Sequence, residues 1–331
     1  MIVGTLQFSP DLGKVAENIA RTNALLNASP PSQHLDLLVL PELAFSGYNH
    51  TRESIQPLLE PSSTGPSTAW AKATAAKYSC IVSVGYPELV KSAPSNGTTP
   101  AATAMAAYNS TVTVSPEGEI LAHYRKTHLY YTDELWAQEG PDKWLVKDLP
   151  LPLSSPNSDK EERVVKAAFG ICMDLNPHRF TAPWDTYEFA TFAREERAEV
   201  LVLSMAWLSS LPADEVRERE AEPDMDTFAY WLGRLSPLLN DGGREVVVVC
   251  ANRCGEESGR NPCGQVEEGV RYAGTSWVGR IGKGKVSVWG LLGRGEEGLL
   301  LVDTDDEPVA TFSLARKADV EAQKRAEEMK A

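Results

Sequence analysis

A cysteine, a glutamate and a lysine each lie at the end of an apolar stretch of this sequence. Cys172 follows the strand-like run 164–171 and precedes turn-forming residues, a setting that favours an exposed thiol over a thiol packed in a core. Glu42 closes the apolar run 35–40, and Lys126 ends the run 120–126. A thiol needs a base and a charge-stabilising partner to act as a nucleophile. The three strand ends supply that set if the fold brings them together.

Each of the three residues also has a structural explanation. Free cysteines are among the most buried residues, Glu42 could be a surface charge, and Lys126 could be a solvated cation. Their sequence context favours catalytic roles. Burial at the end of an apolar run would raise the pKa of the Glu42 carboxyl group toward the range of a general base. Lys126 would lower the pKa of the thiol. Together with the backbone N–H of Met173, it would hold the anion formed when the thiolate attacks a carbonyl.

Glu134 lies eight residues beyond Lys126 and could orient the substrate or the lysine. The alternative is a plain loop carboxylate, since Asp and Glu are mostly exposed. Aromatic and amide side chains near these motifs are predicted to line the pocket: Tyr48, Trp136 and Asn176.

Composition and charge restrict the class of protein. The chain has 331 residues, of which 42% are apolar and 24% charged, as in an ordinary globular protein. Its net charge of −14 argues against nucleic-acid binding and weakly favours a substrate that carries an ammonium group. No stretch is long and apolar enough to span a bilayer, and the first eight residues resemble a strand rather than an export signal. We therefore expect a cytoplasmic protein without a membrane or nucleic-acid partner.

The five cysteines are expected to be reduced thiols. Cys250, Cys254 and Cys263 are loosely spaced, without a fourth ligand or the two-residue gap of paired zinc ligands. Neither a metal nor another cofactor is predicted.

Helix-like and strand-like segments alternate along the chain. Helices are predicted over about 14–28, 67–78, 188–198 and 226–239, and Pro237 should shorten or kink the last of them. Strands are predicted over 2–8, 35–40, 80–86, 105–114, 120–126, 164–171, 200–204 and 246–250, with a surface loop over 92–103. Hairpins and helix-connected strands both occur, so the sheets should be mixed. We predict one α/β domain over residues 1–310 and a polar C-terminal helix over 311–331.

Three motifs resemble the nitrilase, or carbon–nitrogen hydrolase, superfamily. They are Leu40-Pro41-Glu42-Leu43, Tyr124-Arg125-Lys126-Thr127-His128-Leu129 and Phe169-Gly170-Ile171-Cys172-Met173-Asp174, with a weaker match at Leu203-Ser204-Met205-Ala206-Trp207. The resemblance implies an α-β-β-α sandwich of two mixed β-sheets flanked by helices. It also implies a Glu42–Lys126–Cys172 triad, and Glu134 matches a second glutamate found in many members.

The run from Gly170 to Phe180 is similar to one branch of that superfamily, the fungal amidohydrolases that act on protein N-terminal asparagine and glutamine. This resemblance implies a cofactor-independent cysteine hydrolase that releases ammonia from N-terminal Asn or Gln and feeds N-degron protein degradation. Its substrates would be protein or peptide N-termini, and the motifs specify neither the preferred amide nor an oligomeric state. A buried acid should bind the α-ammonium, and Asp133 and Asp174 are candidates because they lie close to catalytic residues in sequence. Asp174 could equally pair with Arg179.

Three alternatives stay open on the sequence. A small-molecule ω-amidase or nitrilase of the same superfamily would not need an α-ammonium. An inactive binding scaffold on the same fold is disfavoured by the intact Glu42, Lys126 and Cys172 set. A papain-like Cys–His protease is also disfavoured, because its nucleophile begins a helix whereas Cys172 ends a predicted strand.

Overall fold

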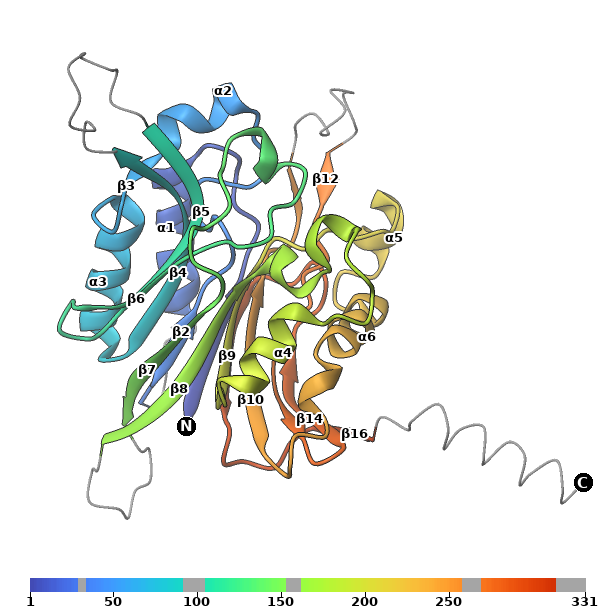
Figure 1. Ribbon diagram of the computed structural model, residues 1–331. Coiled ribbons are helices and arrows are strands. Elements are labelled where there is room, and N and C mark those ends of the chain that lie inside the picture. Colours follow the sequence, from blue (N-terminus) through green and yellow to red (C-terminus); the bar gives the residue numbers. More distant parts are fainter. Residues whose placement is uncertain (29–33, 92–104, 153–161, 258–268, 314–331) are drawn as a thin grey trace, which may run out of the picture.

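The computed structural model describes residues 1–28, 34–91, 105–152, 162–257 and 269–313. In this part of the chain two mixed β-sheets pack face to face, and helices cover both outer faces (Figure 1). The predicted α/β class and the α-β-β-α sandwich are therefore confirmed. Within the same ranges, no helix combines the length and the apolar character needed to cross a bilayer.

The first sheet combines strands from the N-terminal half with one late strand. In spatial order these are β15 (Gly298–Asp303), β1 (Ile2–Gln7), β2 (Leu37–Val39), β4 (Ile81–Lys91), β5 (Met105–Val114) and β6 (Ile120–Arg125), while β3 (Glu60–Pro61) pairs with β4. β2 is parallel to β4, and β5 is antiparallel to both β4 and β6. β2 and β6 therefore run in the same direction, so the residues that follow them leave the sheet at the same end of the strands.

The second sheet carries the nucleophile strand. Its order is β16 (Ala310–Ser313), β14 (Lys285–Leu291), β13 (Trp277–Gly282), β10 (Glu245–Asn252), β9 (Val200–Met205), β8 (Glu162–Ile171) and β7 (Leu145–Pro152). β8, β9 and β10 are mutually parallel. A separate hairpin pairs β11 (Glu256–Glu257) with β12 (Val270–Arg271).

Helices lie on the outer faces of the sandwich (Figure 1). α1 (Val15–Ala28) and α3 (Pro66–Tyr78) cover the first sheet, while α4 (Glu188–Glu195) and α6 (Met225–Arg234) cover the second. The shorter α2 (Arg52–Ile55) and α5 (Ala213–Glu218) lie toward the end of the sandwich that holds the site described below. The 3₁₀ turns are η1 (Gln56–Leu58), η2 (Asp133–Leu135), η3 (Cys172–Leu175), η4 (His178–Phe180) and η5 (Ser236–Leu238).

The packing of β2 on both of its faces explains why its short sequence is apolar throughout. Leu37 and Val39 pack into the core between the two sheets, whereas Leu38 and Leu40 pack into the core beneath α1 and α3. Successive side chains of a strand point to opposite faces, so a strand covered on both faces must be apolar at every position. Because β2 is fully buried, Glu42, which follows it closely, also lies in the protein interior.

The structure departs from the sequence-based prediction most clearly at β7 and at the C-terminal end. β7, absent from the prediction, contains Pro150 and Pro152, which an edge strand tolerates because it lacks a ladder partner on one side. The helix predicted over 311–331 is wrong at 311–313, since Ala310–Ser313 pairs with β14 as β16. Residues 314–331, the loop predicted over 92–103 and Cys263 lie outside the described residues.

The expected effect of Pro237 is confirmed. α6 ends at Arg234, and the proline lies in the 3₁₀ turn Ser236–Leu238 instead of continuing the helix. A proline ring removes a backbone donor and clashes with the preceding turn, which accounts for the early end of the helix.

Candidate active site

The side chains of Glu42 and Lys126 contact each other in the protein interior, at the end of the first sheet where β2 and β6 end. The Lys126 Nζ donates to Glu42 Oε1 at 2.5 Å and to Asp133 Oδ2 at 2.6 Å, and all three side chains are 0% exposed. Lys126 follows β6 directly, and Asp133 is supplied by the 3₁₀ turn η2. The ammonium is thus held between two carboxylates in a setting from which water is excluded, where charge–charge interactions are strong.

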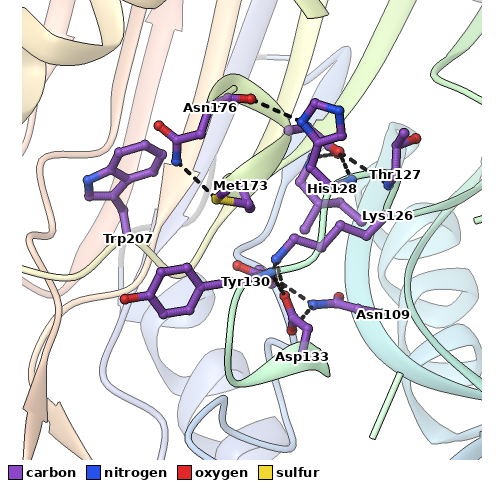
Figure 2. A network of polar contacts seen from close by, with 12 residues as sticks. Asn109, Lys126, Thr127, His128, Tyr130, Asp133, Met173, Asn176 and Trp207 are labelled. Carbon is purple, nitrogen blue, oxygen red and sulfur yellow. Dashed lines mark hydrogen bonds and ion pairs between the residues drawn. The ribbon is translucent and has the colours of Figure 1, made fainter. Parts of the chain in front are cut away.

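Asn109 of β5 ties the two carboxylates to each other. Its Nδ2 donates to Glu42 Oε1 at 2.7 Å and to Asp133 Oδ1 at 3.0 Å. Figure 2 shows Lys126, Asn109 and Asp133 converging in this network. The second oxygen of Glu42, Oε2, is buried and has no hydrogen-bond partner among the described residues. One carboxylate oxygen is therefore oriented by Lys126 and Asn109, and the other is free to accept a proton.

The backbone around Glu42 lies unusually close to β4. A Cβ atom at Gly85 would come within 2.7 Å of Leu43 N and Pro41 O, so only glycine allows this approach. Leu43 itself has a φ of 46°, in the left-handed region. The Glu42 N–H also donates to the carbonyl of Met205, at the end of β9, at 3.3 Å. These contacts carry the glutamate from the first sheet toward the second.

Cys172 stands at the junction between β8 and the 3₁₀ turn η3. Its φ is 42°, so the chain turns sharply at the nucleophile itself. Such conformations are rare for residues with a Cβ atom and cluster at functional sites. The thiol is 8% exposed, which is less than its position at a strand end predicts, and it lines a cavity of about 450 Å³.

The cavity is lined mainly by aromatic and apolar side chains. Its lining comprises Tyr48, Tyr130, Cys172, Met173, Asn176, Phe180, Ala206, Trp207, Leu208, Ser210, Asp226, Thr227 and Tyr230. Tyr48 connects this cavity to the ion cluster, because the Lys126 Nζ lies 5.7 Å from the centre of its ring. Asn176 is held in place by Tyr230, whose hydroxyl donates to Asn176 Oδ1 at 2.5 Å.

Burial controls the protonation of the reacting groups. Desolvation raises the pKa of Glu42 above its usual value, while the charge of Lys126 opposes the shift. Desolvation, followed by the Glu42 charge, also raises the pKa of the Cys172 thiol, and Lys126 offsets only part of this rise. Lys126 thus lowers the pKa of the thiol, as expected, but burial outweighs this effect. The thiol stays protonated at neutral pH, and it needs a base when it attacks.

Lys126 itself remains charged. Burial alone would lower its pKa, but the negative charges of Asp133 and Glu42 outweigh burial and hold the pKa above its usual value. The cation is therefore permanent across the range in which the enzyme could work. It is available to stabilise an anion that forms beside it.

Asp174 is buried, and its carboxylate accepts hydrogen bonds from backbone and side-chain donors. It is therefore not available to bind the substrate α-ammonium or to pair with Arg179. Its carboxylate accepts hydrogen bonds from the Tyr124 hydroxyl at 2.7 Å and from the backbone N–H groups of Ile171 and His128 at 2.8 Å each. It forms no ion pair with Arg179 within the described ranges. Asp174 instead fixes the turn that follows Cys172 against the segment after Lys126.

Glu134 and Trp136 also lie away from the cavity, contrary to the prediction. Glu134 is 39% exposed and lies 3.5 Å from the Arg179 guanidinium. Asp133, one residue earlier, takes the position beside Lys126, because η2 turns successive side chains in different directions. Trp136 belongs to the apolar cluster that also contains Tyr48, but it lines a different hollow. Glu134 is therefore an exposed carboxylate of η2 that pairs with Arg179.

Several residues of the ion cluster and of the cavity lining were not identified from the sequence. Asn109 lies within a strand, where nothing in the local pattern distinguishes it from a neutral strand residue. Tyr130, Tyr230 and Asp226 come from segments far apart in the chain, and only folding brings them together. Trp207 belongs to a motif that the family resemblance had already singled out. No cluster of three or more potential metal ligands occurs in the part of the chain that the structure describes.

Comparison with known proteins identifies the family of this chain. Residues 2–209 match the model of the carbon-nitrogen hydrolase family, and the chain belongs to that family. It is 35% identical to the protein N-terminal amidase of Schizosaccharomyces pombe over 91% of this chain and 98% of the relative.

Solved structures of an N-terminal amidase share the fold. One contains a Gln-Val peptide and has a TM-score of 0.76 at 22% identity. Another contains an Asn-Glu-Ala peptide and has a TM-score of 0.75 at 23% identity. Each alignment covers 96% of this chain and 99% of the compared chain.

Proposed function

We propose that this protein is an N-terminal amidase, which converts N-terminal Asn or Gln of proteins and peptides to Asp or Glu and releases ammonia. The observation that carries the proposal is the free Oε2 of Glu42 in a buried cluster with Lys126, together with the Cys172 thiol, which lines a cavity. The S. pombe relative, aligned over nearly its whole length, is named for this activity. Acting in the cytoplasm, the enzyme would feed N-degron protein degradation.

The first half of the reaction forms a thioester. Glu42 Oε2 takes the thiol proton as the Cys172 sulfur attacks the carboxamide carbon. The carbonyl oxygen becomes an anion, which Lys126 and the backbone N–H of Met173 stabilise. Glu42 then returns the proton to the amide nitrogen, the C–N bond breaks, and ammonia leaves. The raised pKa of Glu42 suits a group that must first accept and then donate this proton.

The second half hydrolyses the thioester. Glu42 removes a proton from water, the resulting hydroxide attacks the thioester carbon, and Lys126 again stabilises the oxyanion. The C–S bond breaks, the sulfur regains its proton, and the side-chain acid is released. Neither a metal nor an organic cofactor enters either step, and the proton passes only between Glu42 and the reacting atoms.

The α-ammonium of the substrate needs an acceptor near the cavity, and the structure leaves one acid for that role. Asp133 is bound to Lys126, and Asp174 is occupied by backbone N–H groups. Asp226 is the one carboxylate in the cavity lining, and it has no hydrogen-bond or ion-pair partner in the described part of the chain. We therefore assign the α-ammonium to Asp226, at the start of α6.

Wild-type protein is expected to release ammonia from peptides that begin with Asn or Gln, but not from their N-acetylated forms. Asp226→Asn should lower kcat/KM for the free peptides about 10- to 100-fold, because a charge-assisted hydrogen bond is lost. Asp214→Asn, which changes an exposed acid outside the cavity lining, is the matched control. Equal hydrolysis of free and acetylated peptides would indicate a generic amidase instead.

Asp133→Asn is expected to shift the pH profile as well as the rate. The negative charge of Asp133 raises the pKa of Glu42, so its removal should lower that pKa and move the acidic limb of kcat/KM to lower pH. Loss of the Asp133 contact to Lys126 should also reduce kcat about 10- to 100-fold. Glu134→Gln, at the exposed neighbouring carboxylate, should change neither quantity. An unmoved acidic limb in the Asp133 variant would contradict the role of Glu42 as the base.

A further inference from the structure

Glu257 is a buried carboxylate that the proposed reaction does not use. It lies in β11, and its two oxygens accept hydrogen bonds from four residues. The backbone N–H groups of Tyr48 and Asn49 donate to Oε2 at 3.1 and 2.9 Å. The Tyr272 hydroxyl also donates to Oε2, at 2.6 Å, and the Arg253 guanidinium donates to Oε1. One carboxylate therefore binds donors from separate parts of the chain.

Arg253 supplies the positive charge that balances Glu257 in the interior. It follows β10 directly, its side chain is buried, and its Cζ atom lies 4.6 Å from the centre of the Tyr272 ring. The loss of hydration offsets most of the attraction within a buried ion pair, so stability alone does not account for this pair. The hydrogen bonds to the charged carboxylate are stronger than neutral ones, and they fix the positions of their donors.

The segment that Glu257 holds contributes one wall of the candidate active site. Tyr48 lines the Cys172 cavity, and the centre of its ring lies 5.7 Å from the Lys126 Nζ. A cation at that distance from a tyrosine ring is attracted by the face of the ring. Tyr48 lies six residues after Glu42, so one loop carries both the base and this wall.

Two further features hold Tyr48 in place. Gly47 has a φ of 83°, and a Cβ atom there would come within 2.7 Å of a Leu12 side-chain carbon and 3.0 Å of Glu257 Oε1. Glycine therefore allows the loop to approach the carboxylate. The Tyr272 ring packs edge-on against the Tyr48 ring, with centroids 6.4 Å apart and an interplanar angle of 85°. Glu257 thus holds the backbone of Tyr48 directly and its ring through Tyr272.

Tyr272 also connects Glu257 to a second part of the cavity lining. It pairs with Leu208 in an isolated antiparallel β-bridge. Leu208 lies just beyond the end of β9, in the second sheet, and lines the cavity. Tyr48 follows β2 of the first sheet. Glu257 therefore joins cavity-lining residues that follow strands of different sheets.

We infer that Glu257 is a positioning residue for amide hydrolysis, which holds Tyr48 as a fixed wall of the cavity beside Lys126. This inference rests on the proposed N-terminal amidase activity. Glu257 is not part of the cavity lining, so it acts on the reaction through Tyr48. Fixed placement matters because a displacement of about 1 Å in an active site can lower the rate on the order of 100-fold.

Substitution of Glu257 tests the inference through ammonia release from peptides that begin with Asn or Gln. Glu257→Gln removes the charge that the four donors share, so kcat/KM should fall about 10- to 100-fold in the folded variant. Glu60→Gln is the matched control, because Glu60 is also buried and accepts the Ser67 N–H at 2.9 Å but lies outside the cavity lining. Glu60→Gln should lower the midpoint of thermal unfolding and keep the wild-type kcat/KM.

Tyr272→Phe gives a milder version of the same test, for the case in which loss of the Arg253 partner prevents Glu257→Gln from folding. It removes one neutral donor to Glu257 and keeps the ring that packs on Tyr48. Its kcat/KM should fall about two- to tenfold, in keeping with the loss of one hydrogen bond.

A double-mutant cycle with Tyr48→Ala separates positioning from a general loss of structure. Tyr48→Ala removes the side chain that Glu257 places in the cavity. In that background Glu257→Gln, or Tyr272→Phe in its stead, should lower kcat/KM by less than about a further threefold. The effect of Glu257→Gln on thermal unfolding should persist in both backgrounds, because the buried Arg253 charge loses its partner in each.

The possible failures are distinguishable. An unchanged kcat/KM in folded Glu257→Gln, or in Tyr272→Phe where the former does not fold, would overturn the inference while leaving the amidase activity established. An equal loss in the wild-type and Tyr48→Ala backgrounds, or a comparable loss in Glu60→Gln, would also overturn it. Ammonia release from none of the peptides by the wild type would overturn the proposed function, and this inference with it.

Discussion

Cys172→Ala is expected to keep the fold and to lose hydrolysis of N-terminal amides. Without the sulfur no thioester can form, so turnover should fall by at least about 10⁴-fold, as for loss of other catalytic nucleophiles. The loss in the free energy of unfolding should stay below about 2 kcal/mol, because only one sulfur atom is removed. Alanine also keeps the Cβ atom, so the backbone strain at the left-handed φ of 42° should not change. Ammonia release and thermal unfolding together measure the two effects.

Covalent trapping provides the complementary measurement. Iodoacetamide should add one carbamidomethyl group to Cys172, and an N-terminal Asn peptide should slow that addition. Hydroxylamine should intercept the wild-type thioester and give a peptide hydroxamate, which the alanine variant cannot produce. Cys80 and Cys254 are buried away from the cavity lining and serve as internal controls in the mass spectrum. Substantial turnover by a folded alanine variant would refute the covalent mechanism.

Lys126→Met should have the second large effect. Loss of one oxyanion donor reduces kcat by on the order of 10²- to 10³-fold in other hydrolases. The loss should be greater here, because Lys126 also orients the base through its 2.5 Å contact with Glu42. A fall in kcat larger than any rise in KM would show that the interaction matters mainly in the transition state.

The same substitution should destabilise the protein in a pH-dependent manner. It leaves the buried Glu42 and Asp133 carboxylates without their cation, and breaking a buried pair costs about 3–5 kcal/mol. Without Lys126 the pKa of Glu42 in the folded state should rise further above its unfolded value. The protein can then relieve the cost at low pH by binding a proton, and the penalty grows as the pH rises through the folded pKa. Urea unfolding at pH 5 and pH 8 should therefore show the larger loss at pH 8.

Two variants separate the role of Lys126 in catalysis from its role in stability. Lys283→Met removes an exposed lysine paired with Glu245 at 2.7 Å and should change neither activity nor stability appreciably. Asp133→Asn combined with Lys126→Met removes one unpaired charge but keeps the base Glu42, so it should recover part of the stability while turnover stays low. If the single variant were inactive only because it unfolds, the partly restabilised double variant would regain turnover.

The α/β class and most strand positions followed from local patterns. β5 was predicted at its observed bounds, because its sequence is apolar and β-branched and a tight turn at Pro116–Glu119 follows it. β7 was missed because Pro150 and Pro152 argue against a strand, and only its edge position, which depends on the neighbouring strands, permits them. The helix predicted at the C-terminal end failed at 311–313, since pairing with β14 outweighs a weak local preference.

The sequence by itself determined that Glu42, Lys126 and Cys172 each follow an apolar strand, because strand periodicity and chain breaks are local properties. Only the tertiary structure decided that the first two come from one sheet and the third from the other, since sheet pairing depends on contacts between distant residues. It also decided that Asp133 rather than Glu134 contacts the lysine. Neighbouring carboxylates are chemically alike in sequence, and the rotation of a 3₁₀ turn selects which one is buried.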